Sequence, residues 1–356
     1  MRKYFIIISI LFFLSGCVCE KKVPEKEIEK IPEVTYPSEE IVKEEKALDE
    51  EVKEEVKTEE IKIEEVKKED IKTEEYKKED VAKKEEIVLL PKEKISQKEG
   101  KKTDKGLSKK IYLEKWNGEC LIYNLKWNLM SFGKAIVICF EEKNNFHLVG
   151  ITLPEGLPRQ FDYGYNRVDS FIDKKTGLTK YFYLYTRSGK KETTTEIFFN
   201  WSGKQYTVIA KKYRNKKLYS TKRNVIKFED DIFDPILVFY FLRYINIENI
   251  ENTEYTIALS EKWYLKINYK GTEIKKLPEG DKKEVYIIEP LVRTEKEKFK
   301  EGKLDIYITK DDDKIPVYFE GKVPIGKANL YLTGKQKIEC SKYNNVNEVI
   351  NEILKY

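Results

Sequence analysis

TKYFYLYTRSGKKETTTEIFFNWSGKQYTVIAK, residues 179–211, decides the fold class of this chain. Runs of aromatic, Thr, Val and Ile residues alternate here with the turn signals Ser188-Gly189 and Ser202-Gly203. β-branched and aromatic residues favour strands, and Ser-Gly pairs favour tight turns. The stretch therefore predicts consecutive antiparallel strands. They are Thr179 to Thr186, Thr193 to Phe199 and Gln205 to Lys211.

The same pattern continues over most of residues 106–356, which hold 39 of the 45 aromatic residues. Further strands are predicted at Glu119 to Trp127, Lys134 to Phe140, His147 to Leu153, Arg167 to Ile172, Tyr255 to Lys270, Val285 to Val292, Leu304 to Thr309, Ile315 to Phe319 and Ala328 to Leu332. Asp234-Pro235 and the apolar run to Ile245 predict a short buried helix. A weaker helix is predicted near Val346 to Leu354. The predicted fold is all-β, a strongly curved antiparallel sheet or incomplete barrel with one packed α-helix.

The first sixteen residues are typical of a signal peptide. A cationic start, Met1-Arg2-Lys3, precedes an apolar run from Tyr4 to Leu14 that is too short to span a membrane. Leu14-Ser15-Gly16-Cys17 then resembles the bacterial lipobox. The resemblance implies cleavage between Gly16 and Cys17 and lipid on the Cys17 thiol, with several acyl chains giving firm attachment. Because Val18 replaces the inner-membrane retention residue Asp, the outer membrane facing the periplasm is favoured over the inner membrane.

Residues 17–105 are predicted to form a charged tether, disordered or loosely helical. From Glu20 to Lys105 there are 29 acidic and 22 basic residues and two aromatic ones. Such a composition cannot bury enough apolar surface to offset the entropy of the chain. A five-residue repeat over residues 56–80 places its apolar residues in a spiral around a helix and on alternate faces of a strand, so no partner helix or sheet is implied.

The β-rich domain is expected at 106–340, followed by the C-terminal helix within 341–356. Three of its motifs resemble the exported bacterial family called domain of unknown function 3108. These are Gly118 to Tyr123 with Trp127 and Gly133, the segment Asp234 to Arg243, and Leu304 to Leu330 through Asp312-Asp313-Lys314-Ile315-Pro316-Val317. The resemblance covers about residues 118–332 and implies a fold, with no activity to transfer. Lys314 stands where the family often has Arg, which weakens a bidentate role there.

Residue types with catalytic potential are few. His147 is the one histidine, so a multi-histidine zinc site is excluded and a Ser-His-Asp triad would have to surround it. An ordinary strand residue is the favoured interpretation. Asp311-Asp312-Asp313 is expected to form a turn and not a calcium site, because the EF-hand spacing is missing. No cofactor or metal is expected. Whether Cys19, Cys120, Cys139 and Cys340 form disulfides stays open.

Asp234 and Arg243 are the candidate structural or binding residues. Asp234 is expected to cap the predicted helix, and Arg243 lies in its last turn. Arg243 is expected to complement the helix dipole. The alternative is a buried bidentate contact with a carboxylate or an anionic headgroup.

The expected function is that of a membrane-anchored envelope lipoprotein acting as a non-catalytic binding or assembly module. The alternatives are an enzyme acting on envelope glycan or lipid, and a structural spacer or partner-docking protein. Residues 106–356 carry 44 basic and 34 acidic residues, which suits an anionic lipid, a glycan or an envelope protein as partner. Export argues against nucleic acid. The basic run Lys211 to Lys217 fits either a solvated turn or a binding patch.

Overall fold

A computed structural model describes residues 34, 36–37, 113–128, 130–155, 163–250, 253–277, 280–297, 299, 304–322 and 327–354. The chain divides into two units, residues 1–36 with 108–356 and residues 37–107. The predicted signal peptide, Cys17 and nearly all of the predicted tether lie outside the described residues. The fold described below is that of the first unit.

Fifteen strands make up most of the described residues. They are β1 (Glu119–Trp127), β2 (Met130–Glu142), β3 (Asn145–Pro154), β4 (Tyr163–Asp173), β5 (Thr179–Ser188), β6 (Lys191–Asn200), β7 (Gln205–Arg214), β8 (Lys217–Lys227), β9 (Ile232–Phe233), β10 (Glu254–Ala258), β11 (Lys262–Lys276), β12 (Lys282–Thr294), β13 (Leu304–Thr309), β14 (Pro316–Lys322) and β15 (Lys327–Lys337). The helices are η1 (Leu113–Trp116), α4 (Pro235–Tyr244), η2 (Cys340–Lys342) and α5 (Val346–Ile353).

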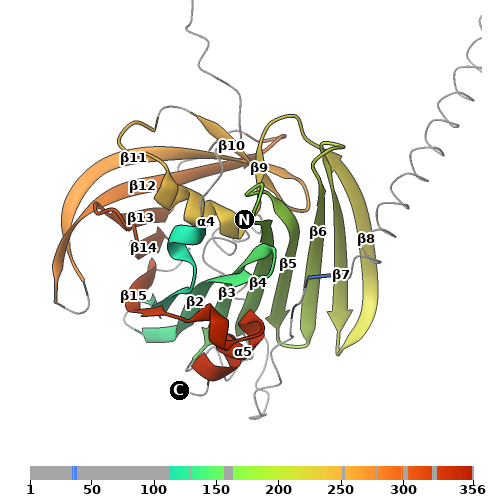
Figure 1. Cartoon of the computed structure of the whole chain (residues 1–356), viewed down its shortest axis with the longest axis horizontal. Helices are drawn as coiled ribbons and strands as arrows, with labels where there is room; N and C mark the ends of the chain where they lie inside the picture. The colour runs from blue at the N-terminus through green and yellow to red at the C-terminus, as the bar shows by residue number, and fades with distance from the viewer. Residues whose placement is uncertain are drawn as a thin grey trace, which may run out of the picture. The chain divides into compact units, whose positions relative to one another are not determined.

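All fifteen strands belong to one sheet, in the order β8-β7-β6-β5-β4-β3-β2-β1-β15-β14-β13-β12-β11-β10-β9. Neighbours are antiparallel except β9 and β10, which are parallel. The sheet curves strongly and stays open, since β8 and β9 are its two ends (Figure 1). The predicted all-β fold with a curved, incomplete barrel is confirmed. One predicted strand, Tyr255 to Lys270, is two strands, because a turn at residues 259–261 separates β10 from β11.

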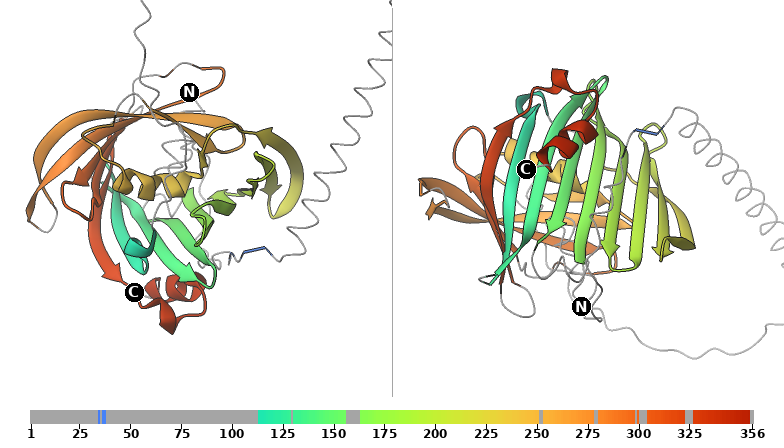
Figure 2. Two further views of the ribbon diagram at one scale, coloured as in Figure 1. Left: turned by 45° about the horizontal axis from the view of Figure 1, so that its top comes forward. Right: turned by 90° about the horizontal axis from the view of Figure 1, so that it is seen from below.

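The first and last strands pair in the middle of the sheet, with Glu119 opposite Lys337 and Trp127 opposite Ala328. Two meanders, β2 to β8 and β10 to β14, extend from this seam in opposite directions. Inward-facing apolar residues of both meanders form one main core, because side chains alternate between the two faces of each strand. The helix α4 lies within the curve of the sheet and contributes six buried apolar residues to this core (Figure 2).

The outer face of the sheet carries a second, smaller core. Val346, Val349 and Ile350 of α5 pack there on side chains of β1, β2 and β3. The predicted C-terminal helix is therefore present, and it covers the face opposite α4. No helix among the described residues is long and apolar enough to cross a membrane.

Two residues that sequence analysis placed in the tether contact the β-rich unit. Val34 is buried against Phe171 and Tyr181 of the outer face, and its carbonyl oxygen accepts a hydrogen bond from Asn347 Nδ2 at 3.1 Å. The Tyr36 ring lies edge-on to Phe171, with ring centroids 5.4 Å apart. Val34 and Tyr36, here called the Val34 strap, therefore pack on β4 and β5. Sequence analysis did not predict this packing, because the surrounding residues are mostly charged.

Candidate functional site

The helix α4 brings Arg243 into the interior of the unit. Asp234 caps the first turn. Pro235 is the first residue of the helix, where a backbone N–H would have no partner within the helix, so the N–H that proline lacks is not missed. Nine residues further on, Arg243 lies in the last turn and is 2% exposed. Because the two residues occupy opposite ends of the helix, about 13 Å apart at 1.5 Å per residue, they do not form a single site.

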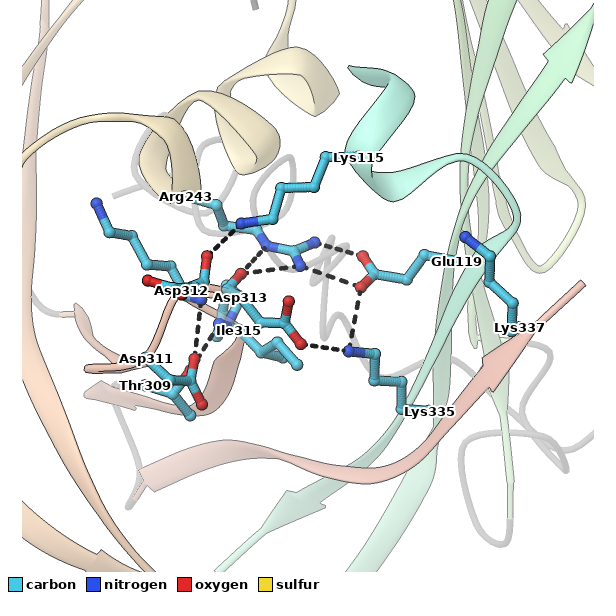
Figure 3. A network of polar contacts seen from close by, with 12 residues as sticks. Lys115, Glu119, Arg243, Thr309, Asp311, Asp312, Asp313, Ile315, Lys335 and Lys337 are labelled. Atoms are coloured by element: carbon cyan, nitrogen blue, oxygen red, sulfur yellow. Dashed lines mark hydrogen bonds and ion pairs between the residues drawn. The ribbon is translucent and has the colours of Figure 1, made fainter. Parts of the chain in front are cut away.

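The Arg243 guanidinium forms a bidentate ion pair with Glu119 at the start of β1 (Figure 3). Nη2 donates to Glu119 Oε2 at 3.0 Å, and Nη1 donates to Oε1. Nε and Nη2 also donate to the Asp313 carbonyl oxygen, at 3.2 and 3.1 Å. The guanidinium carbon lies 4.8 Å from the centroid of the Trp116 ring, a cation–π distance. The bidentate alternative from the sequence is therefore what the structure contains.

The charges around this ion pair are balanced. Lys335 Nζ lies 2.8 Å from Asp313 Oδ2 and 3.9 Å from Glu119 Oε2. Burial opposes the charge on Arg243, but hydrogen bonding and attraction to Glu119 outweigh it and raise the pKa of the guanidinium. The hydrogen bond from Lys335 lowers the pKa of Asp313. Two cations and two carboxylates thus contact one another, and they are here called the Arg243 network.

The turn between β13 and β14 positions the Asp313 carbonyl. Asp311 Oδ1 accepts hydrogen bonds from the Lys314 backbone at 3.0 Å and from Thr309 Oγ1 at 2.6 Å. The predicted turn at the three aspartates is confirmed. Lys314 Nζ donates to the Ile245 carbonyl at 2.6 Å, just beyond the end of α4, so this lysine makes a single contact and no fork. No group of three potential metal ligands occurs among the described residues.

Asp234 is fully buried and acts as the expected helix cap. Oδ1 accepts from the backbone of Ile236 and Leu237 at 3.0 and 2.9 Å. Oδ2 accepts from Ser170 Oγ at 2.8 Å and Thr179 Oγ1 at 2.5 Å, which ties α4 to β4 and β5. Burial raises the pKa of this carboxyl group in spite of the four donors. Asp234 is thus fully engaged in positioning the helix.

A second network lies on the outer face and was missed by sequence analysis. His147 of β3 is 1% exposed, and its two ring nitrogens contact Glu142 Oε1 at 3.2 Å and Asp169 Oδ1 at 2.9 Å. Its ring also stacks on Phe171, with centroids 3.9 Å apart. His147 is a strand residue as expected, but both of its polar atoms are used in an ion-pair chain. The sequence does contain a signal of this network. Arg167 and Asp169 lie two residues apart in a predicted strand, so their opposite charges point to the same face and can pair.

This His147 network connects the sheet to both chain segments on its outer face. Arg167 donates to both Asp169 oxygens at 2.7 Å and to Asn347 Oδ1 of α5 at 2.7 Å. Glu142 Oε1 accepts from the Val346 backbone at 2.9 Å, at the first residue of α5. Asn347 in turn donates to the Val34 carbonyl. The network therefore fastens α5 and the Val34 strap to β2, β3 and β4.

The stability of the protein is expected to fall as pH rises above about 6.5, the ordinary pKa of histidine. Burial lowers the pKa of His147, but its hydrogen bonds to Asp169 and Glu142 outweigh burial and raise it. A raised folded-state pKa stabilises the fold below the unfolded-state value, and this contribution is lost as pH rises through the folded-state value. Urea unfolding of wild type and His147→Gln at about pH 6 and 9 measures it. An equal pH dependence in both proteins would contradict this expectation.

The described cysteines, Cys120, Cys139 and Cys340, are all free thiols. Burial raises the pKa of Cys120 to about 12, and burial also raises that of Cys139 well above its ordinary value. A thiol with a raised pKa is not an activated nucleophile, because the thiolate is the reactive form. Cys19 lies outside the described residues.

The sequence model of DUF3108, described as a protein of unknown function, matches residues 122–333. The chain belongs to this family. The match confirms the resemblance, and all three motifs that carried it meet in the Arg243 network of this DUF3108 member. Glu119 precedes the matched segment, while Arg243 and Asp313 lie inside it.

Among solved structures, this DUF3108 chain is similar to a crystal structure described as a β-barrel-like protein of domain of unknown function DUF1849 from Brucella abortus. The similarity covers 62% of this chain and 98% of that chain, at 9% sequence identity and a TM-score of 0.41. No curated protein matches the chain.

Proposed function

We propose that this DUF3108 protein is a lipid-anchored, non-catalytic binding or assembly module of the bacterial cell envelope. The supporting observation is that the buried charged side chains of the described residues are engaged by other groups of the chain. Arg243 is paired with Glu119, and both ring nitrogens of His147 contact carboxylates. A general base needs a ring nitrogen within reach of a substrate proton, and the buried His147 offers none.

The anchor in this proposal is Cys17, and the location is the envelope, with the outer membrane facing the periplasm favoured. The lipobox-like Leu14 to Cys17 supports lipidation. Two or three acyl chains, at about 0.8 kcal/mol per buried methylene, hold a protein firmly at a bilayer. The basic, Tyr-rich unit then meets anionic lipid, glycan or protein partners in the same compartment.

Cys17→Ala is expected to abolish lipid labelling and to release the protein from membranes. The acyl chains attach to this thiol and to the amine freed by cleavage before it, so alanine removes the site. Growth with an alkyne fatty acid, followed by click detection and membrane fractionation, measures both effects. Cys19→Ala, two residues away, is the matched control and should keep the label. Equal labelling of the Cys17 variant and wild type would overturn the anchor.

The non-catalytic part of the proposal has a separate test. Purified full-length protein, incubated with isolated envelope glycan and lipid, is expected to leave the mass spectra of both unchanged. A new product that disappears in the His147→Gln variant, while thermal melting shows that this variant is folded, would establish an enzyme instead.

A further inference from the structure

The strand β8 is a long end strand of the sheet. Ten of its eleven residues pair with β7 on one side, from Lys217 opposite Arg214 to Lys227 opposite Gln205, and Tyr219 is the extra residue of a β-bulge. In the described part of the chain, no strand pairs with its other side. Figure 2 shows β8 at the outer limit of the sheet, next to β7. An unpaired strand edge presents a row of backbone donors and acceptors that another strand can complete.

The hairpin formed by β7 and β8 has an extreme charge composition. Residues 205–227 contain eight basic residues and no acidic residue. The basic residues are Lys211, Lys212, Arg214, Lys216, Lys217, Lys222, Arg223 and Lys227. Lys211 pairs with Glu196 of β6 at 3.2 Å. Lys217, Lys222 and Lys227 lie exposed on β8 itself. A positive field of this density attracts and orients an anionic partner.

β8 also exposes apolar side chains. Leu218 is 53% exposed, Tyr219 is 61% exposed and Val225 is 41% exposed. Leu218 lies opposite Tyr213 and Val225 lies opposite Thr207, an even number of residues away in β7, so Leu218 and Val225 flank the same face of the sheet. A strand added beside β8 would pack its own side chains against these groups.

We infer that β8 is the docking edge for an extended acidic polypeptide segment, which adds to the sheet as a further antiparallel or parallel strand. The inference rests on the proposed binding function and names its partner class. Lipid phosphates and glycans complete only part of the edge, because the backbone N–H and C=O groups from Ser220 to Lys227 form a regular row that matches another backbone. A second copy of β8 is disfavoured, because it would set basic residues against basic residues.

The test uses full-length Cys17→Ala protein, which removes the question of membrane attachment. The probe is a twelve-residue peptide of alternating Glu and Val, measured by fluorescence anisotropy. Lys222→Glu/Lys227→Glu is expected to weaken binding about tenfold or more. Lys276→Glu/Lys282→Glu, which makes the same charge change at exposed positions of the β11–β12 hairpin, should leave binding unchanged. Melting curves check that both variants keep the fold.

Methylated peptides separate strand addition from simple charge attraction. A peptide N-methylated at every second residue keeps one edge able to pair and should bind. A peptide N-methylated at every residue keeps the charge but lacks both edges, so its binding should be lost. Equal binding of the two peptides, no binding of the parent peptide, or competition by phosphatidylglycerol vesicles would overturn the inference. None of these outcomes depends on lipid labelling or on product formation.

Discussion

Replacing Arg243 with alanine is expected to lower the free energy of unfolding by about 3 to 5 kcal/mol. The variant leaves the Glu119 carboxylate buried without its bidentate partner, and it removes two donors from the Asp313 carbonyl. It also takes a cation from the face of Trp116. Urea unfolding of the full-length protein, followed by tryptophan fluorescence and circular dichroism, measures the loss.

Two companion variants separate geometry from charge at Arg243. Arg243→Lys keeps the charge but cannot form a fork, so it should also destabilise the protein, by less than alanine. Arg243→Met with Glu119→Leu removes both buried charges together and should recover much of the stability, because neither partner is left unpaired. If alanine and lysine at this position both unfold like wild type, the ion pair contributes nothing to the fold.

Replacing Asp169 with alanine is expected to cost a similar amount, about 3 to 5 kcal/mol. Asp169 is fully buried and accepts from Arg167 through both oxygens, and it also contacts His147. Its loss would leave a buried guanidinium and, below the pKa of His147, a buried imidazolium. The urea midpoint at about pH 6, below the ordinary pKa of histidine, measures the effect.

The Asp169 variant should also loosen the two segments on the outer face. Arg167 orients Asn347, and Asn347 holds the Val34 carbonyl. Hydrogen exchange at α5 is therefore expected to rise in Asp169→Ala before the sheet unfolds. Asp230→Ala, an exposed aspartate, is the control and should change neither reading. Unchanged exchange at α5 would mean that apolar packing alone retains the helix.

The sequence predicted the local structure well because its signals are local. Alternating strands, the cap at Asp234 and the turn at Asp311 each depend on a few neighbouring residues. The contacts that define the candidate sites are long-range. Glu119 and Arg243 meet only because the whole sheet brings β1 and α4 together. The pairing of β1 with β15 cannot be predicted from the composition of either strand. The family motifs did indicate the importance of Arg243, because the three motif segments are the ones that meet in the Arg243 network.

The His147 network shows a second limit. A histidine between two apolar residues looks the same in sequence whether it packs in a core or bridges two carboxylates. Only the register of β3 against β4, which places His147 opposite Phe171 and near Asp169, makes the difference. A one-residue shift would move the side chain to the other face of the sheet.

The pairing of β1 with β15 has a consequence for how the chain reaches its native state. β1 is the first strand of the chain and β15 is the last, so this central pair can form only after β15 has been synthesised. Because closing a long loop is slow, non-local pairing of this kind delays folding. Until then β2 can cover one side of β1, while the side that will pair with β15 keeps its backbone N–H and C=O groups unpaired.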